Sequence, residues 1–106
     1  MSIKQKHKEW RKRFSTLVFT RDSFKCRICN KLDGLDAHHI TDRHEMPNGG
    51  YVIENGITLC EKHHLEAEQF HISGNVKGVD GMYPNDLYKM IDSSYELAFI
   101  KSEQLL

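Results

Sequence analysis

The 106-residue chain has no long apolar run, no net charge and only three cysteines. None of its apolar stretches approaches the roughly 20 residues that a membrane-spanning helix needs. The charged N-terminal segment lacks the apolar core of a secretory signal, which predicts a cytoplasmic protein. An odd number of cysteines in such a chain argues against a disulfide framework and favours metal ligation.

The length and composition of the chain are typical of one small globular domain, because 106 residues with 39% apolar side chains build only a small core. Its charge is unevenly distributed. Residues 1–27 carry nine Lys and Arg against two Asp and Glu, a net of +7, and residues 28–106 carry −7. A basic arm on an acidic body suggests a polyanionic partner, although a solvated helix with many lysines would look the same in composition.

The order of sequence patterns predicts an α+β fold. Trp10, Phe14, Leu17 and Val18 recur at the spacing of one helix face, and cations occupy the other faces. The expected elements are a helix over about 5–20, strands at 35–40 and 56–60, a helix over 61–72 and a helical segment over about 85–104. A long loop containing Pro-Asn-Gly-Gly joins the two strands.

Two short motifs provide candidate ligands for a structural zinc ion. Cys26 and Cys29 form C-x2-C, and Cys60 and His63 form C-x2-H. Four nitrogen and sulfur donors fit tetrahedral Zn²⁺, and a closed site of this kind braces a core too small to hold itself. The neighbouring His64 competes with His63 for the fourth position, and three cysteines without a histidine are a further alternative.

Four more polar residues, His38, His39, Asn55 and His64, lie close to these motifs. The runs AHHI and NGITLCEKHH resemble the HNH endonucleases, or ββα-metal nucleases, over about residues 18–71. In that family a metal-ligating Asp or His precedes a His, and an Asn that opens the second strand lies nine residues before a His on the helix. Asn55 and His64 have that offset. The resemblance implies a ββα-metal core over about residues 21–73, with zinc-binding knuckles and flanking N-terminal and C-terminal helices, in one domain of residues 1–106.

The resemblance also implies roles for these residues. His39 would be the general base, and His38 and His64 would bind a catalytic divalent metal. Asn55 would hold the loop and orient the imidazole of the base. Glu68, one helical turn after His64, is a candidate third ligand where some members have His. Because adjacent strand residues face opposite sides, the roles of His38 and His39 could be exchanged. Mg²⁺, Mn²⁺, Ni²⁺ and Zn²⁺ all remain candidate catalytic metals.

The activity implied is that of a metal-dependent DNA endonuclease or nickase of low sequence specificity, which leaves a 5′-phosphate and a 3′-hydroxyl. A monomer would nick double-stranded DNA, and a homodimer would cut both strands. The candidate contacts to backbone phosphates are Lys8, Arg11, Lys12, Arg13 and Arg21. Arg21 could instead pair with Asp22, and His44 and His71 are expected to be bystanders.

The chain resembles the small free-standing proteins of this type that bacteriophages encode. A phage origin would imply phage or packaging proteins as partners. It would also place the protein in the host cytoplasm, away from membranes. Two other functions remain open. A non-catalytic zinc-knuckle module that binds nucleic acid or protein would have no use for His39 and Asn55. A nuclease of the same chemistry could act on RNA, because nothing in the sequence excludes a 2′-hydroxyl.

Overall fold

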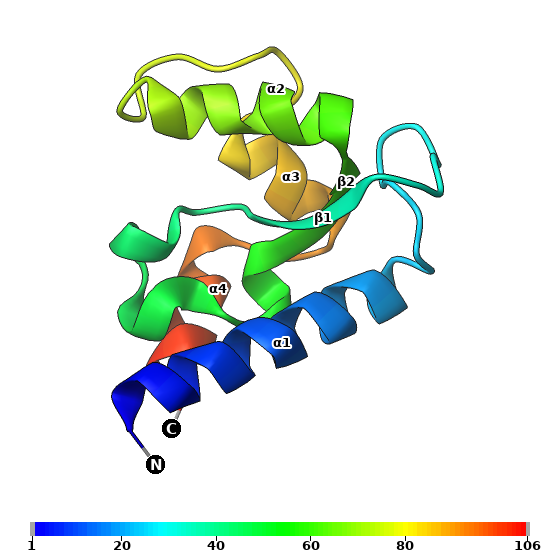
Figure 1. The fold of residues 1–106 in the computed structure, drawn as a ribbon. Coiled ribbons are helices and arrows are strands. Elements are labelled where there is room, and N and C mark those ends of the chain that lie inside the picture. The colour runs from blue at the N-terminus through cyan, green and yellow to red at the C-terminus, as the bar shows by residue number, and fades with distance from the viewer. Residues whose placement is uncertain (1, 106) are drawn as a thin grey trace.

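The computed structural model describes residues 2–105, and it confirms the predicted α+β class (Figure 1). The described chain forms α1 (Ile3–Arg21), β1 (Leu35–His39), β2 (Gly56–Cys60), α2 (Glu61–Ile72), α3 (Pro84–Met90) and α4 (Tyr95–Glu103). Three short 3-10 turns lie in the loop between the strands, at Arg43–Glu45, Pro47–Gly50 and Ile53–Asn55. None of the helices within residues 2–105 is long and apolar enough to cross a membrane.

The strands form an antiparallel pair between two helices. In its register His38 lies opposite Ile57, and His39 lies opposite Gly56. The helix α1 packs on one face of the pair and α2 on the other, so the strands are the middle of three layers (Figure 1). Successive strand residues point to opposite faces, and the two histidines of β1 therefore face different helices.

Helix α1 begins at a capping box. The Ser2 hydroxyl accepts a hydrogen bond from the Gln5 N–H at 3.2 Å, and the Gln5 side chain accepts one from the Ser2 N–H at 3.0 Å. The residues of α1 that are buried against the hairpin are Trp10, Phe14 and Val18. Leu17, which the helical spacing placed on the same face, is 43% exposed, so the apolar face is narrower than predicted.

A glycine sets how closely α1 approaches the strands. A Cβ atom on Gly56 would lie 2.5 Å from Val18 Cγ2 and 2.6 Å from the Phe14 ring, closer than real Cβ contacts allow. The absent side chain lets Phe14 lie directly beside the strand position opposite His39. The stacking of His39 described below depends on this approach.

Asp22 joins the end of α1 to the hairpin. Its buried carboxylate accepts hydrogen bonds from Arg21 at 2.8 Å, Arg27 at 2.7 Å and the Thr58 N–H at 2.9 Å. Burial alone would raise the pKa of Asp22, but these hydrogen bonds together lower it. Arg21 also donates to the carbonyl oxygens of Ile53 and Gly56. Arg21 therefore takes the alternative role of pairing with Asp22, and its contact with a phosphate stays a prediction.

The C-terminal segment is two short helices, where the sequence predicted one. Helix α3 ends at Met90, and Asp92 has a positive φ of 53°, which breaks the helical path. The hydroxyl of Ser94 then accepts a hydrogen bond from the Leu97 N–H at 3.1 Å and caps α4. Asp and Ser compete with the helix for backbone hydrogen bonds, and this local chemistry outweighs the apolar spacing on either side.

Candidate functional site

The knuckle cluster, which we define as Cys26, Cys29, Cys60 and His63, brings the four predicted zinc donors together. Cys26 and Cys29 lie on the turn after α1, Cys60 ends β2, and His63 lies in the first turn of α2. All four donor atoms lie within 4.8 Å of one another. This group can hold a structural metal such as zinc, and His63, rather than His64, is its histidine.

The spacing of these donors fits a tetrahedral ion. The Sγ atoms of Cys29 and Cys60 are 3.8 Å apart, and the Nδ1 atom of His63 lies 3.3 Å from Cys60 Sγ and 3.7 Å from Cys26 Sγ. Tetrahedral bonds of ordinary Zn–S and Zn–N length separate their donors by about 3.8 Å (S···S) and about 3.6 Å (S···N). Burial would raise the pKa of Cys26, but backbone hydrogen bonds from Cys60, Cys29 and Ile28 lower it to about 6, which favours the thiolate that a metal binds.

A second cluster, which we call the groove cluster, consists of His38, His64 and Glu68. The Oε1 atom of Glu68 lies 3.3 Å from His38 Nδ1 and 3.3 Å from His64 Nε2. The buried His38 Nδ1 has no hydrogen-bond partner in the described chain, although the carboxylate is near. Burial lowers the pKa of His38, and the His38 imidazole in turn lowers the pKa of Glu68 to about 2. A neutral imidazole with a free lone pair beside an ionised carboxylate is a donor set that divalent metals accept.

Asp36 orients one of these ligands. Its Oδ2 atom lies 3.2 Å from His64 Nδ1, so the proton on Nδ1 can be donated to the carboxylate and the lone pair of Nε2 faces Glu68. A carboxylate behind a histidine in this way fixes the tautomer and raises the basicity of a metal ligand. The sequence analysis missed Asp36, although it lies two residues before His38 and therefore on the same face of β1.

His39 faces the opposite side of the strand and packs between two aromatic rings. Its imidazole stacks on Phe14 with a centroid distance of 4.5 Å and meets Tyr51 edge-on at 5.1 Å. Burial, and after it the neighbouring His38 and Arg43, lower the pKa of His39 to about 4, so the ring is neutral at pH 7. Its Nε2 atom is buried and has no hydrogen-bond partner among residues 2–105, which leaves Nδ1 as the nitrogen that can meet solvent.

Asn55 holds the loop that follows β1. Its buried amide donates hydrogen bonds to Thr41 O at 3.1 Å and Gly50 O at 3.2 Å. Its Oδ1 atom accepts from the Thr41 N–H at 2.9 Å and from the Tyr88 hydroxyl at 2.8 Å. These four bonds give the loop-holding role expected of Asn55. None of its hydrogen bonds within residues 2–105 reaches the His39 ring, which Phe14 and Tyr51 position instead.

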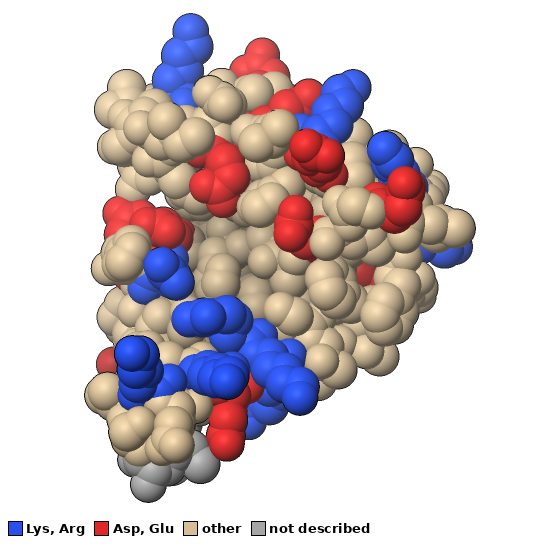
Figure 2. Space-filling model, viewed as in Figure 1, with Lys and Arg blue, Asp and Glu red and all other residues tan. Residues whose placement is uncertain are grey.

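His39 and His64 both line one groove of about 530 Å³, in which His39 comes from one side of β1 and His64 and Glu68 come from the other. Figure 2 shows Lys and Arg gathered over α1 below this hollow, with Asp and Glu above it. Arg11 and Arg43 both line the groove. An elongated anion could therefore lie along the basic wall and present one phosphate to the groove cluster.

The predicted phosphate contacts are spread around α1. Arg11 faces the groove, and the exposed Lys8, one turn earlier, shares its side of the helix. Lys12 and Arg13 line a separate shallow hollow on α1. Arg43, which the sequence analysis did not single out, supplies a groove cation from the loop instead.

His71, which was expected to be a bystander, lies against His38 and lines the groove. Its Nε2 atom lies 3.2 Å from the His39 carbonyl oxygen, to which it can donate, and its ring stacks on His38 at 5.5 Å. The helical spacing from His64, seven residues or two turns, was a signal that could have placed it on this face. His44 lies exposed on the loop, as expected.

No family model matches the sequence, and no curated protein or solved structure matches the chain. Support for a function therefore comes from the residues of the two clusters and the groove between α1 and α2.

Proposed function

We propose that the chain is a metal-dependent endonuclease of the HNH type that hydrolyses phosphodiester bonds in double-stranded DNA. The observation that carries this proposal is that His39 lines one groove together with His64 and Glu68 of the groove cluster, and that Arg11 of α1 lines the same groove. A zinc-knuckle module that only binds its partner would need the knuckle cluster and the basic helix. It would have no use for an unpartnered, buried His38 beside an ionised Glu68.

The residues of the groove cluster would hold the catalytic ion through His38 Nδ1, His64 Nε2 and a Glu68 oxygen. A divalent cation bound there would stabilise negative charge on the scissile phosphate and on the leaving 3′ oxygen. Three protein donors leave room for oxygen ligands from the substrate, whereas the four donors of the knuckle cluster close that site.

His39 supplies the base. Its neutral imidazole takes a proton from a water molecule through Nδ1, and the oxygen of that water forms a bond to phosphorus as the bond to the 3′ oxygen breaks. The departing 3′ oxygen takes a proton from a solvent water molecule, and the proton on His39 returns to solvent. The products are a 5′-phosphate and a 3′-hydroxyl. The stacked Phe14 and the edge of Tyr51 hold the ring in place during the transfer. The negative charge of a bound phosphate raises the pKa of His39 from its low value toward the range that a general base needs.

Arg11 and Arg43 position the strand. Neither guanidinium makes an ion pair within the part of the chain that the structure describes, so both are free to contact phosphates. Such contacts give affinity without sequence information, as the proposed low sequence specificity requires. Phage or packaging proteins, as partners of a phage-encoded nuclease, are part of the same proposal.

The test is conversion of supercoiled plasmid to open circles by zinc-loaded protein, with Mg²⁺, Mn²⁺, Ni²⁺ or added Zn²⁺ in turn. His39→Gln keeps a polar side chain of similar size but cannot act as the base, and we expect it to lower the rate by about 10²–10⁴-fold. The matched control is His44→Gln, an exposed histidine on the loop, which is expected to leave the rate unchanged.

Duplex DNA, single-stranded DNA and RNA are compared as substrates in the same assay. Equal cleavage of RNA would assign the chemistry to a less selective nuclease. A rate that His39→Gln leaves unchanged with every metal and every substrate would contradict the proposal and favour the binding module.

A further inference from the structure

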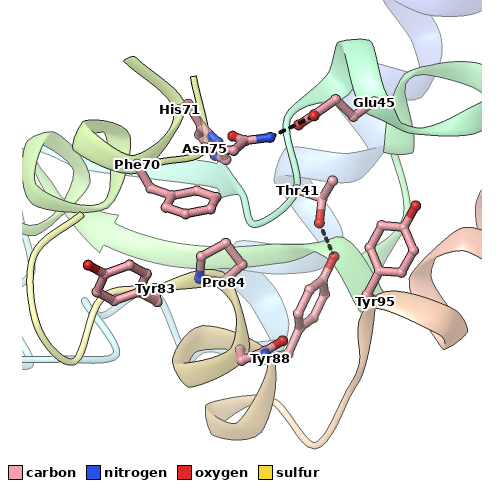
Figure 3. Close-up of a pocket in the computed structure, with 10 residues that line it drawn as sticks. Thr41, Glu45, Phe70, His71, Asn75, Tyr83, Pro84, Tyr88 and Tyr95 are labelled. Carbon is pink, nitrogen blue, oxygen red and sulfur yellow. Dashed lines mark hydrogen bonds between the residues drawn. The ribbon is translucent and has the colours of Figure 1, made fainter. Parts of the chain in front are cut away.

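A second cavity lies behind the groove, on the side of α3 and α4 (Figure 3). Its volume is about 360 Å³, within the range of about 300–1,000 Å³ that is usual for small-molecule pockets. The walls are mainly flat and apolar, and come from Phe70, Tyr83, Pro84, Tyr88 and Tyr95. Flat aromatic walls favour a planar ring as ligand, because such a ring can stack on them face to face.

The polar groups on one side of this pocket are already used by the protein. The Tyr88 hydroxyl donates to Asn55 Oδ1 at 2.8 Å, and Thr41 Oγ1 lies 2.6 Å from the same hydroxyl, to which it can donate (Figure 3). This side therefore offers a ligand few hydrogen bonds. It serves to hold Asn55, and through Asn55 the loop after β1.

The polar groups on the opposite side have spare capacity. Asn75 donates one amide hydrogen to Glu45 Oε1 at 2.7 Å (Figure 3). The second amide hydrogen, the amide oxygen and the other carboxylate oxygen make no further hydrogen bond in the described chain. Together they form a row of donor and acceptor positions, which is the kind of pattern that the edge of a nucleobase presents.

The charge of the pocket selects against anions. Glu45 is the only charged side chain among its lining residues, and neither Lys nor Arg is among them. A phosphate group would be repelled, whereas a neutral heterocycle with N–H or amino donors would be attracted to the carboxylate.

The pocket adjoins the groove through His71, which lines both. The Nε2–H group of His71 is directed to the His39 carbonyl oxygen, and the buried Nδ1 atom has no partner in the described chain. The groove that holds Arg11 and Arg43, where a phosphate is proposed to bind, and the aromatic pocket that holds Glu45 thus share one imidazole. Phosphate and base are likewise parts of one nucleotide.

We propose that this pocket binds a nucleobase. The choice of a nucleobase over other planar heterocycles rests on the proposed function, because a nucleic-acid substrate is what would bring such a ring to this place. The base comes either from an unpaired nucleotide of the substrate strand or from a free nucleoside. Bases with an amino group, which can donate to Glu45, bind more tightly than thymine.

The first arm of the test titrates zinc-loaded protein, without exchangeable metal, with guanosine, cytidine, adenosine and thymidine, and follows backbone amide resonances by NMR. Tyr95 and Glu45 are both exposed enough to be replaced without loss of the fold, which far-UV circular dichroism checks. We expect Tyr95→Ala to weaken binding of every nucleoside by at least about fivefold. Glu45→Gln is expected to remove the preference for amino-bearing bases. The matched controls are Leu97→Ala and Glu103→Gln, which lie outside the pocket and should change nothing.

The second arm compares a duplex carrying one unpaired guanine with the fully paired duplex. Tighter binding of the former, lost in Tyr95→Ala, identifies the substrate as the source of the base. Binding of nucleosides alone identifies a free ligand. The proposal is overturned if neither nucleosides nor the unpaired nucleotide bind preferentially, or if binding is indifferent to both pocket variants. Neither arm requires cleavage. A protein that nicks plasmid but does not bind nucleobases would therefore support the proposed nuclease function and contradict nucleobase binding in this pocket.

Discussion

The knuckle cluster and the groove cluster share helix α2, yet they differ in the number of donors that the chain supplies. The adjacent His63 and His64 lie in its first turn, and each belongs to a different cluster. Side chains of neighbouring helical residues diverge by about 100°, so one turn of helix can serve two sites. The first cluster has four donors and is closed; the second has three and opens to a groove.

This difference indicates how a chain of this size divides its polar residues between stability and chemistry. The knuckle cluster ties the turn after α1 to β2 and α2, and its Cys26 and Cys60 are part of the buried core. The groove cluster crosses from β1 to α2 and includes half-exposed donors. We therefore expect loss of the first to unfold the protein and loss of the second to leave it folded but inactive.

The largest effect is expected at the knuckle cluster. Cys26→Ser removes a buried thiolate donor, and structural zinc contributes about 10–16 kcal/mol in small zinc domains, as much as the whole stability of a typical domain. The variant should lose its zinc and its cooperative thermal transition, as measured by elemental analysis and circular dichroism. A chain that keeps a cooperative transition after chelation would show that zinc is dispensable.

Asn55→Ala comes next, because it leaves the backbone of Thr41, the Gly50 carbonyl and the Tyr88 hydroxyl without their partner. We expect a loss of about 3–4 kcal/mol in the free energy of unfolding by urea. Asn85→Ala, on an exposed side chain, is the control and should stay within about 0.5 kcal/mol. Equal stability of the two variants would mean that the loop does not depend on Asn55.

Two arginines of α1 separate structure from substrate binding. Arg21→Ala removes one of the donors to Asp22 and the side-chain donor to two carbonyl oxygens, and it is expected to cost about 2 kcal/mol of stability. Arg11→Ala should leave stability within about 0.5 kcal/mol, but reduce the slope of log K against log salt for DNA binding by about 0.9. The opposite pattern would place the phosphate contact at Arg21.

The smallest effect on stability is expected at the groove cluster. His64→Ala should retain its zinc and change the free energy of unfolding by less than about 1 kcal/mol, because the imidazole is partly exposed and its acidic partners are at the surface. Isothermal titration with Mn²⁺ should nonetheless show at least about tenfold weaker binding. His63→Ala, the adjacent control, should lose zinc. If His64→Ala loses zinc instead, His64 belongs to the knuckle cluster and His63 to the groove cluster.

The sequence predicted the regular elements near the clusters well, since local patterns determine them. The spacing of Cys60 and His63, and the alternation in β1, are local features, and the strand over 56–60 and the helix over 61–72 begin and end as expected. The broken C-terminal segment was not predicted, because apolar spacing continues across Asp92 while its backbone does not.

The rest of the site depends on contacts between distant segments. The role of Arg21 follows from its place beside the Ile53 and Gly56 carbonyls, more than 30 residues away in the chain. Arg43 and His71 come from a loop and from the end of α2, and only the packing of these segments brings them to the groove. The aromatic rings that hold His39, rather than Asn55, are likewise a tertiary feature.

The most direct test of the central claim follows Mn²⁺ binding and plasmid nicking in one titration of zinc-loaded protein. If the two clusters are metal sites of different kinds, each chain should bind one exchangeable Mn²⁺ and retain its zinc. The nicking rate should rise in proportion to the Mn²⁺ occupancy, and nicking should disappear in His64→Ala. A site that fills without any nicking, or nicking that is unaffected by the loss of His64, would contradict the claim that the groove cluster is the catalytic centre.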